Sequence, residues 1–159
     1  MRQKKNIEFA KDLIKGRIAE TVFEQMIREE GRYTVIPFGY EHTMPTLAQY
    51  RDHAVLKQVM ANISDAPDFA LVSQDKKEVH LVEVKYRSSW KNAELVDIAE
   101  KLLQRWSLSW VFLATPKGFY CSTSNSILKN GKIENLPESW VVHSRQKEYL
   151  ELLNEFEKK

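Results

Sequence analysis

The segment DAPDFALVSQDKKEVHLVEVKYR, residues 65–87, decides the expected fold. Two short runs of β-branched and apolar residues flank a charged turn, a pattern typical of two adjacent strands. Asp68 opens the first run, and Glu83 and Lys85 interrupt the second among valines. Because strand side chains alternate between faces, Glu83 and Lys85 share one face. Ionised groups are costly there unless they are paired or bind a metal.

The composition predicts one domain over residues 1–159. The chain is 43% hydrophobic and 29% charged, with few Gly and Pro, which is ordinary for a globular protein with a substantial core. No repeat, low-complexity segment or linker marks a second domain. The net charge of +2 is too small to indicate a polyanionic partner by itself.

Basic residues nevertheless cluster at the N-terminus and directly after the second run. Such clusters can attract nucleic acid, although a solvated surface is the more usual explanation for any one residue. The clusters contain Arg2, Lys4, Lys5, Lys11, Lys15 and Arg17, and then Lys85, Arg87 and Lys91.

Several sequence features bear on the compartment and on cofactors. The single cysteine, Cys121, cannot form an internal disulfide, which predicts a reducing compartment. The basic N-terminus is not followed by an apolar signal core, and no apolar run has membrane length. We therefore expect a cytoplasmic protein without a membrane partner. The chain has no Gly-rich phosphate-binding loop, so we expect no nucleotide cofactor.

Apolar periodicity predicts the elements of the first half. A long helix over residues 6–30 is expected to pack on more than one element and to end at Gly31. A strand over residues 32–38 follows, which Pro37 shortens or places at a sheet edge. A helical insertion over about residues 42–62 is expected beside the sheet.

The second half predicts further helices and strands. A helix over residues 92–106 precedes an almost entirely apolar strand, 108–115, that is expected to be buried on both faces. We expect a hairpin at Asn130-Gly131, since Asn-Gly supplies the two positive φ angles of a type I′ turn. The region of about 119–159 is completed by strands over 119–122 and 140–142 and a helix over 144–156. The whole is an α/β fold with a mixed central sheet flanked by helices.

The charged residues Asp68, Glu83 and Lys85 have an ordinary explanation and a functional one. Asp68 can be a turn residue after proline, and the other two can lie on a solvated strand face. However, Asp68 starts one apolar strand, Glu83 and Lys85 interrupt an adjoining one, and adjacent strands can bring all three to one sheet edge. Two carboxylates within a few ångströms repel each other, and a divalent cation with oxygen ligands removes that repulsion. The pattern therefore favours a metal site.

At these residues the chain resembles a known family. Pro-Asp at 67–68 followed by Glu-Val-Lys at 83–85 resembles the signature of the PD-(D/E)XK nuclease superfamily. The run GRIAE, residues 16–20, is similar to the first-helix motif of its Holliday-junction-resolvase-like members. The resemblance covers roughly residues 15–115 and implies a restriction-endonuclease-like αβββαβ core.

Two features depart from the family pattern. The segment over about 42–62 is longer than in compact resolvases. The helix after Lys85 has no clear match to the family's additional polar residue, for which Lys101 and Gln104 are both candidates.

The resemblance also implies an activity. It predicts an Mg²⁺-dependent nuclease, with Mn²⁺ as a substitute, that hydrolyses phosphodiester bonds of duplex or branched DNA. Asp68 and Glu83 would bind the metal together with the main-chain carbonyl of Val84. Lys85 would position or deprotonate the attacking water, or stabilise charge on the phosphate; a lysine base needs a lowered pKa.

Further residues are implied from outside the strand pair. Glu20 would approach the metal from the first helix, directly or through water, with Glu24 one turn on as the alternative. The ordinary explanation of Glu20 is an exposed helix carboxylate. Contacts with nucleic acid are expected from Arg17, Arg87, Lys91 and Gln104.

Two alternatives to a nuclease stay open at this point. The first is a nuclease-fold module that binds nucleic acid or a protein partner without cleaving. The intact Asp68, Glu83 and Lys85 argue against it, because a pure binding module would tolerate their loss. The second is an unrelated α/β protein in which the motif is fortuitous, and Asp68 and Glu83 would then lie far apart. The resemblance to the nuclease family also implies a homodimer, whose interface we place either in the apolar region 119–140 or on the C-terminal helix.

Overall fold

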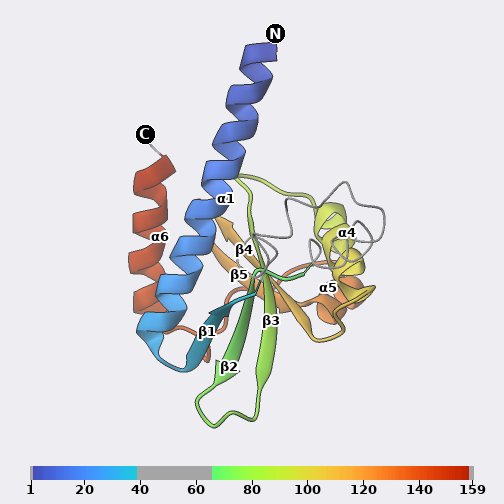
Figure 1. Ribbon diagram of the computed structural model, residues 1–159, viewed down its shortest axis with the longest axis vertical. Helices are drawn as coiled ribbons and strands as arrows, with labels where there is room; N and C mark the ends of the chain where they lie inside the picture. The colour runs from blue at the N-terminus through green and yellow to red at the C-terminus, as the bar shows by residue number, and fades with distance from the viewer. Residues whose placement is uncertain (1, 39–65, 158–159) are drawn as a thin grey trace, which may run out of the picture.

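The computed structural model describes residues 2–38 and 66–157, which form a five-stranded mixed sheet with helices on both faces (Figure 1). Among these strands, only β3 and β4 run parallel, and the other neighbours are antiparallel. The expected mixed α/β architecture is therefore confirmed. In spatial order the strands are β1 (Tyr33–Pro37), β2 (Phe69–Ser73), β3 (Val79–Tyr86), β4 (Ser109–Thr115) and β5 (Gly118–Thr123).

Two pairs of helices cover the sheet. The helices α1 (Arg2–Glu30) and α6 (His143–Glu157) lie side by side on one face, and α4 (Asn92–Leu103) and α5 (Ser124–Asn130) cover the other (Figure 1). The helix α4 connects β3 with β4, because parallel neighbours need a crossover connection. The predicted helices over 6–30, 92–106 and 144–156 are confirmed, with ends shifted by a few residues.

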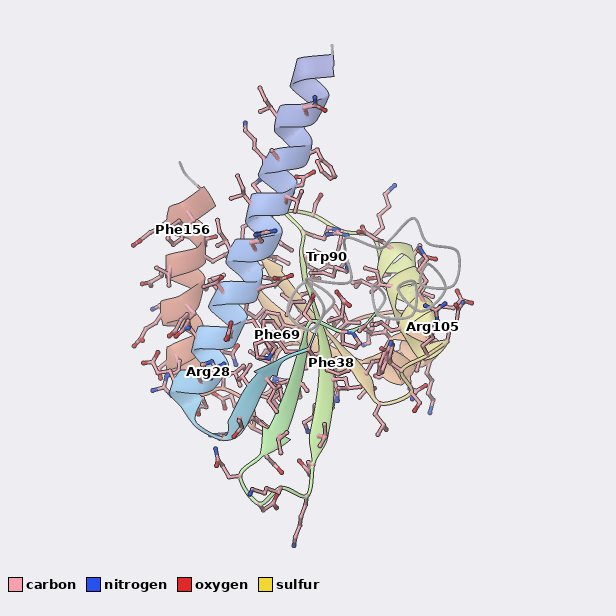
Figure 2. All side chains as sticks on the ribbon, viewed as in Figure 1. Arg28, Phe38, Phe69, Trp90, Arg105 and Phe156 are labelled. Atoms are coloured by element: carbon pink, nitrogen blue, oxygen red, sulfur yellow. The ribbon has the colours of Figure 1, made fainter. Side chains whose placement is uncertain are left out.

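The helix α1 divides into a buried half and a projecting half. Its second half packs on the sheet and on α6, and Phe23 lies with its ring centroid 5.3 Å from that of Phe69 and 4.7 Å from that of Phe112. Figure 2 shows Phe69 in the interior between α1 and the strands. The first half extends beyond the sheet (Figure 1) and carries exposed apolar residues. These residues are Ile7, Phe9, Leu13 and Ile14.

Gly31 ends α1 as expected. Its φ of 77° lies in the left-handed region that favours glycine, and its N–H donates to the Ile27 carbonyl over 3.2 Å. The following strand β1 lies at the edge of the described sheet, where the missing N–H of Pro37 does least harm. Both predictions are confirmed.

The hairpin predicted at Asn130-Gly131 is wrong. Residues up to Asn130 belong to α5, where the Thr123 hydroxyl accepts the Ser126 N–H over 3.1 Å. Gly131 has a φ of 69°, and its N–H donates to the Ile127 carbonyl over 2.8 Å. The left-handed conformation that Asn-Gly supplies is used to end a helix instead of turning a hairpin.

The strand predicted over 140–142 is also wrong. Trp140 lies in a turn, where its N–H donates to the Pro137 carbonyl over 3.0 Å, and its indole is buried in the core. The strands predicted over 108–115 and 119–122 are confirmed as β4 and β5. The helical insertion expected over about 42–62 lies outside the described residues.

The main core lies between the sheet and the helices α1 and α6. Cys121 of β5 is buried within it, and this burial raises the pKa of its thiol well above the usual range. In the described part of the chain, no helix combines the length and apolar character that crossing a bilayer requires.

Candidate functional site

The pairing of β2 with β3 ends at a proline. Phe69 lies opposite Val82, so two further steps of the same register would set Pro67 opposite Val84. Proline has no N–H to donate, and the ladder cannot continue. The N–H of Val84 is instead bound by Asp68, whose Oδ2 accepts it over 2.8 Å. The carbonyl of Val84 points to the same side of the strand as this N–H, beyond the last paired residue of β2.

This ending brings two carboxyl groups together. Glu83, whose side chain is 16% exposed, follows Val82 on β3, and its carboxyl shares a hydrogen bond with that of Asp68. Burial, followed by the negative charge of Asp68, raises the pKa of Glu83 to about 9, although Lys85 acts in the opposite direction.

Lys85 completes the group on the same face of β3. Its Nζ lies 3.7 Å from Oε1 of Glu83, and its side chain is 34% exposed. The amine therefore reaches the carboxylates from the solvent side. The residues that alternate with Glu83 and Lys85 along β3 face the other side of the sheet. These residues, Val82, Val84 and Tyr86, lie in the core under α1.

The first helix contributes Glu20 to this group. Glu20 is half-buried on α1, and its charge adds to the rise in the Glu83 pKa. Glu24, one turn on, forms an ion pair with Arg28 over 2.9 Å, and Arg28 also donates to the Val35 carbonyl of β1. The charge of Glu20 acts on Glu83, whereas the carboxylate of Glu24 is engaged by Arg28.

The donor set suits Mg²⁺. Within the described residues, no three side chains of His, Cys, Asp and Glu come close enough together to form a metal site alone. Mg²⁺, however, is commonly held by one or two carboxylates while the remaining positions are filled by water. Asp68, Glu83 and the carbonyl of Val84 are hard oxygen donors at one point of the sheet, where burial and then the negative charge of Asp68 raise the pKa of Glu83. The residues present fit a divalent cation.

The residues expected to contact nucleic acid are spread more widely. Arg87 pairs with Glu94 in the first turn of α4 and donates to the Tyr86 carbonyl over 2.7 Å. Lys91 is exposed at the N-cap of α4, and Gln104 is exposed at its C-cap, so the length of this helix separates them. Arg17 lines a groove between α1 and α6. The structure brings Arg87 and Lys91 to one end of the sheet, whereas Arg17 and Gln104 lie apart from them.

Sequence reasoning missed a contact at the end of β3. The amine of Lys15 lies 5.7 Å from the centroid of the Tyr86 ring, a cation–π arrangement that fixes a positive charge near the end of the strand. The hydroxyl of Tyr86 is buried and has no hydrogen-bond partner within the described residues. The sequence feature that could have indicated this contact is the aromatic residue Tyr86 directly after Lys85. A lysine of the first helix can lie over such a ring.

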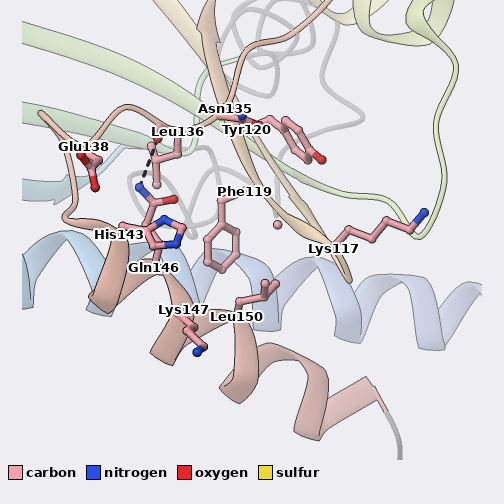
Figure 3. A pocket seen from close by; sticks show the side chains of 11 residues that line it. Lys117, Phe119, Tyr120, Asn135, Leu136, Glu138, His143, Gln146, Lys147 and Leu150 are labelled. Atoms are coloured by element: carbon pink, nitrogen blue, oxygen red, sulfur yellow. Dashed lines mark hydrogen bonds between the residues drawn. The ribbon is translucent and has the colours of Figure 1, made fainter.

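A separate hollow of about 490 Å³ lies between β5 and α6 (Figure 3). Phe119 and Leu150 form part of its wall, and Gln146 donates to the Leu136 carbonyl over 3.2 Å at its rim. None of the predicted site residues lines this hollow. The chemistry of the carboxylate group is therefore independent of it.

No protein-family model matches the chain, and comparison with curated proteins gives no significant match.

Proposed function

We propose that the protein is an Mg²⁺-dependent nuclease of the PD-(D/E)XK type. The observation that supports this most directly is the carboxyl pair of Asp68 and Glu83 on adjacent strands, with the amine of Lys85 3.7 Å from Glu83. Buried carboxylates placed next to each other destabilise a fold unless a cation or proton is shared between them. A site that maintains this arrangement, with a lysine beside it, has the electrostatics of a metal-dependent hydrolase.

The order of elements supports the same proposal. The described helices and strands run α1, β1, β2, β3, α4, β4, which matches an αβββαβ core, with residues 39–65 between β1 and β2. The proposed site lies where β2 ends and β3 continues beside β4 alone. Within the described residues, the carbonyl of Val84 has no strand partner on the β2 side, so it is a further oxygen donor for the proposed cation.

Each residue has a distinct role in the proposed reaction. Asp68 is held in place by the Val84 N–H, which leaves its other oxygen for the metal. Glu83 gives up its proton on metal binding, and Lys85 orients the attacking water or stabilises charge on the phosphate. When bound, Mg²⁺ lowers the pKa of a coordinated water and neutralises charge on the phosphodiester. Water adds to phosphorus, one P–O bond to the sugar breaks, and the leaving oxygen takes up a proton.

We propose DNA, duplex or branched, as the substrate. The basic residues Lys15, Lys91 and Arg87 lie around the end of the sheet at which β3 leaves the site. Phosphate contacts of this kind position a nucleic acid without reading its sequence.

Cleavage assays test this function. Supercoiled plasmid, linear duplex and a four-way junction are incubated with Mg²⁺, with Mn²⁺ and with EDTA. Cleavage is expected with either metal and not with EDTA. Asp68→Asn, which keeps an acceptor for the Val84 N–H, and Lys85→Ala are each expected to lower the rate about 10²- to 10⁴-fold.

Lys132→Ala is the matched control. Lys132 lies 3.6 Å from Glu134, much as Lys85 lies from Glu83, but in an exposed pair outside the site. This variant is expected to cleave at the wild-type rate. Cleavage that persists in both site variants would refute the assignment, and DNA binding without cleavage of any substrate would favour a non-catalytic module.

A further inference from the structure

We propose that the chain forms a homodimer in which the projecting half of α1 lies in the groove between α1 and α6 of a second copy. The projecting half has a large apolar surface for a solvent-facing helix. Ile7 and Ile14 are each 57% exposed. They are seven residues apart, so they lie two turns apart on one face of the helix.

This exposed face continues the face that already packs on α6. The groove between α1 and α6 has a volume of about 280 Å³ and starts at Ile14, where α6 ends. Its walls include Ile18 of α1 with Leu152 and Phe156 of α6, and Phe156 is 56% exposed. Figure 2 shows Phe156 at the outer end of α6, beside α1. Ile14 therefore belongs both to the groove and to the exposed apolar face of the projecting half.

The helix directions allow a closed pair. The helices α1 and α6 run antiparallel (Figure 1), so a second α1 placed antiparallel to the first runs parallel to α6. A two-fold axis near Ile14 would set Ile7 of the partner subunit at the level of Thr21 and Tyr149, which line the same groove. The same contact then forms twice, and the assembly closes as a dimer.

Charge selects a second copy over other occupants. Residues 2–17 contain six basic and two acidic residues, whereas α6 contains four glutamates against one arginine and one lysine. Lys11 is the i+4 neighbour of Ile7 and the i−3 neighbour of Ile14, so it flanks the exposed apolar face. On α6, the exposed residues Glu148 and Glu155 lie one turn before and one turn after Leu152, which lines the groove. Parallel packing of α1 on α6 brings these opposite charges together, while a nucleic acid would be repelled by α6.

Sedimentation or light scattering over a range of micromolar concentrations tests the oligomeric state. The wild type is expected to be dimeric, and Ile7→Glu is expected to raise the dimer dissociation constant about 30-fold or more, as for a central apolar contact. Phe9→Glu is the control on the same helix, because Phe9 lies away from the face that Ile7 and Ile14 share. Since both side chains are exposed, neither change should disturb the fold. A wild-type monomer, or a dimer that Ile7→Glu leaves unchanged, would overturn the proposal.

A charge exchange tests the orientation. Lys11→Glu and Glu155→Lys should each weaken self-association, because each homodimer then places like charges in contact. Mixing the two variants should restore a dimer, since both contacts of the mixed pair join opposite charges again. Failure of the mixture to associate better than either variant alone would overturn the arrangement. A monomer whose α1 instead binds anionic vesicles or duplex DNA in the same experiments would assign this face to another partner.

Discussion

Glu30 and Glu83 both have largely buried side chains, but the charges around them differ in sign. Glu30, at the end of α1, has a side chain that is 5% exposed, and it accepts Arg145 over 2.6 Å and lies 3.2 Å from Arg32. Glu83 is 16% exposed and faces the carboxyl group of Asp68, with Lys85 3.7 Å away at the solvent side. The chain therefore neutralises a buried carboxylate fully where structure alone requires it. At Glu83 an excess of negative charge is left, as expected where a cation binds.

The same substitution at both positions should have opposite effects on stability, and the larger effect is expected at Glu83. Between pH 4.5, the ordinary pKa, and about 9, folded Glu83 holds a proton that the unfolded chain releases, so wild-type stability falls as pH rises. Glu83→Gln removes this dependence. We expect it to raise the free energy of unfolding by about 2–4 kcal/mol at pH 8 and to have little effect near pH 4.

Chemical denaturation at both pH values measures this difference. The variant should at the same time lose cleavage activity, because an amide cannot replace the carboxylate as a metal ligand. Lower stability of Glu83→Gln at pH 8 would show that its carboxyl group is not electrostatically strained.

Glu30→Gln should destabilise the fold. The change removes the carboxylate that Arg145 and Arg32 share, although Glu29 remains 3.7 Å from Arg145, and we expect a loss of about 2 kcal/mol in the free energy of unfolding. The loss should be constant between pH 6 and 9, in contrast with Glu83→Gln, and cleavage should be retained. An unchanged denaturation midpoint would mean that the ion pairs of Glu30 contribute no net stability.

The smallest expected effect is stabilisation by the metal itself. At ten times its dissociation constant, Mg²⁺ should raise the free energy of unfolding of the wild type by about 1.4 kcal/mol. The affinity should increase with pH towards 9, because Glu83 must release its proton before it binds a cation. Thermal unfolding with Mg²⁺ and with Na⁺ at equal ionic strength provides the measurement.

Asp68→Asn serves as the control for metal binding. It keeps the acceptor for the Val84 N–H but loses the charge, so Mg²⁺ should no longer shift its unfolding temperature. An equal shift in wild type and variant would place the cation elsewhere on the protein.

Much of the fold was predictable because local pattern and tertiary context agree. The run from Pro67 to Tyr86 has strand propensity, a polar turn and, at its start, a proline that ends the pairing, and all three act in the same direction. The error at Gly131 shows the limit of such reasoning. A left-handed residue ends a helix as well as it turns a hairpin, and the choice depends on Ile127, which is buried against α4.

The site was predictable to a similar extent. Strand alternation places Glu83 and Lys85 on one face, and the expected pairing of the two adjacent strands brings Asp68 to them. Glu20 was expected from the sequence with Glu24 as the alternative, because helical periodicity sets both near the apolar face. The ion pair of Glu24 with Arg28, which periodicity does not predict, favours Glu20. Ile7 and Ile14 also fit the apolar face of α1, so periodicity predicts that they are buried. They are exposed because the first half of α1 extends beyond the sheet, and the helical pattern does not reveal this.

The position of Cys121 offers a way to follow the molecule as a whole. Its thiol is enclosed in the main core, and burial disfavours the thiolate, the form that reacts with maleimides and disulfide reagents. Modification therefore requires β5 to leave the core, which couples labelling to opening of the sheet. Because the chain has no other cysteine, the rate of labelling reports the rate at which the sheet opens. No engineered probe is needed for this measurement.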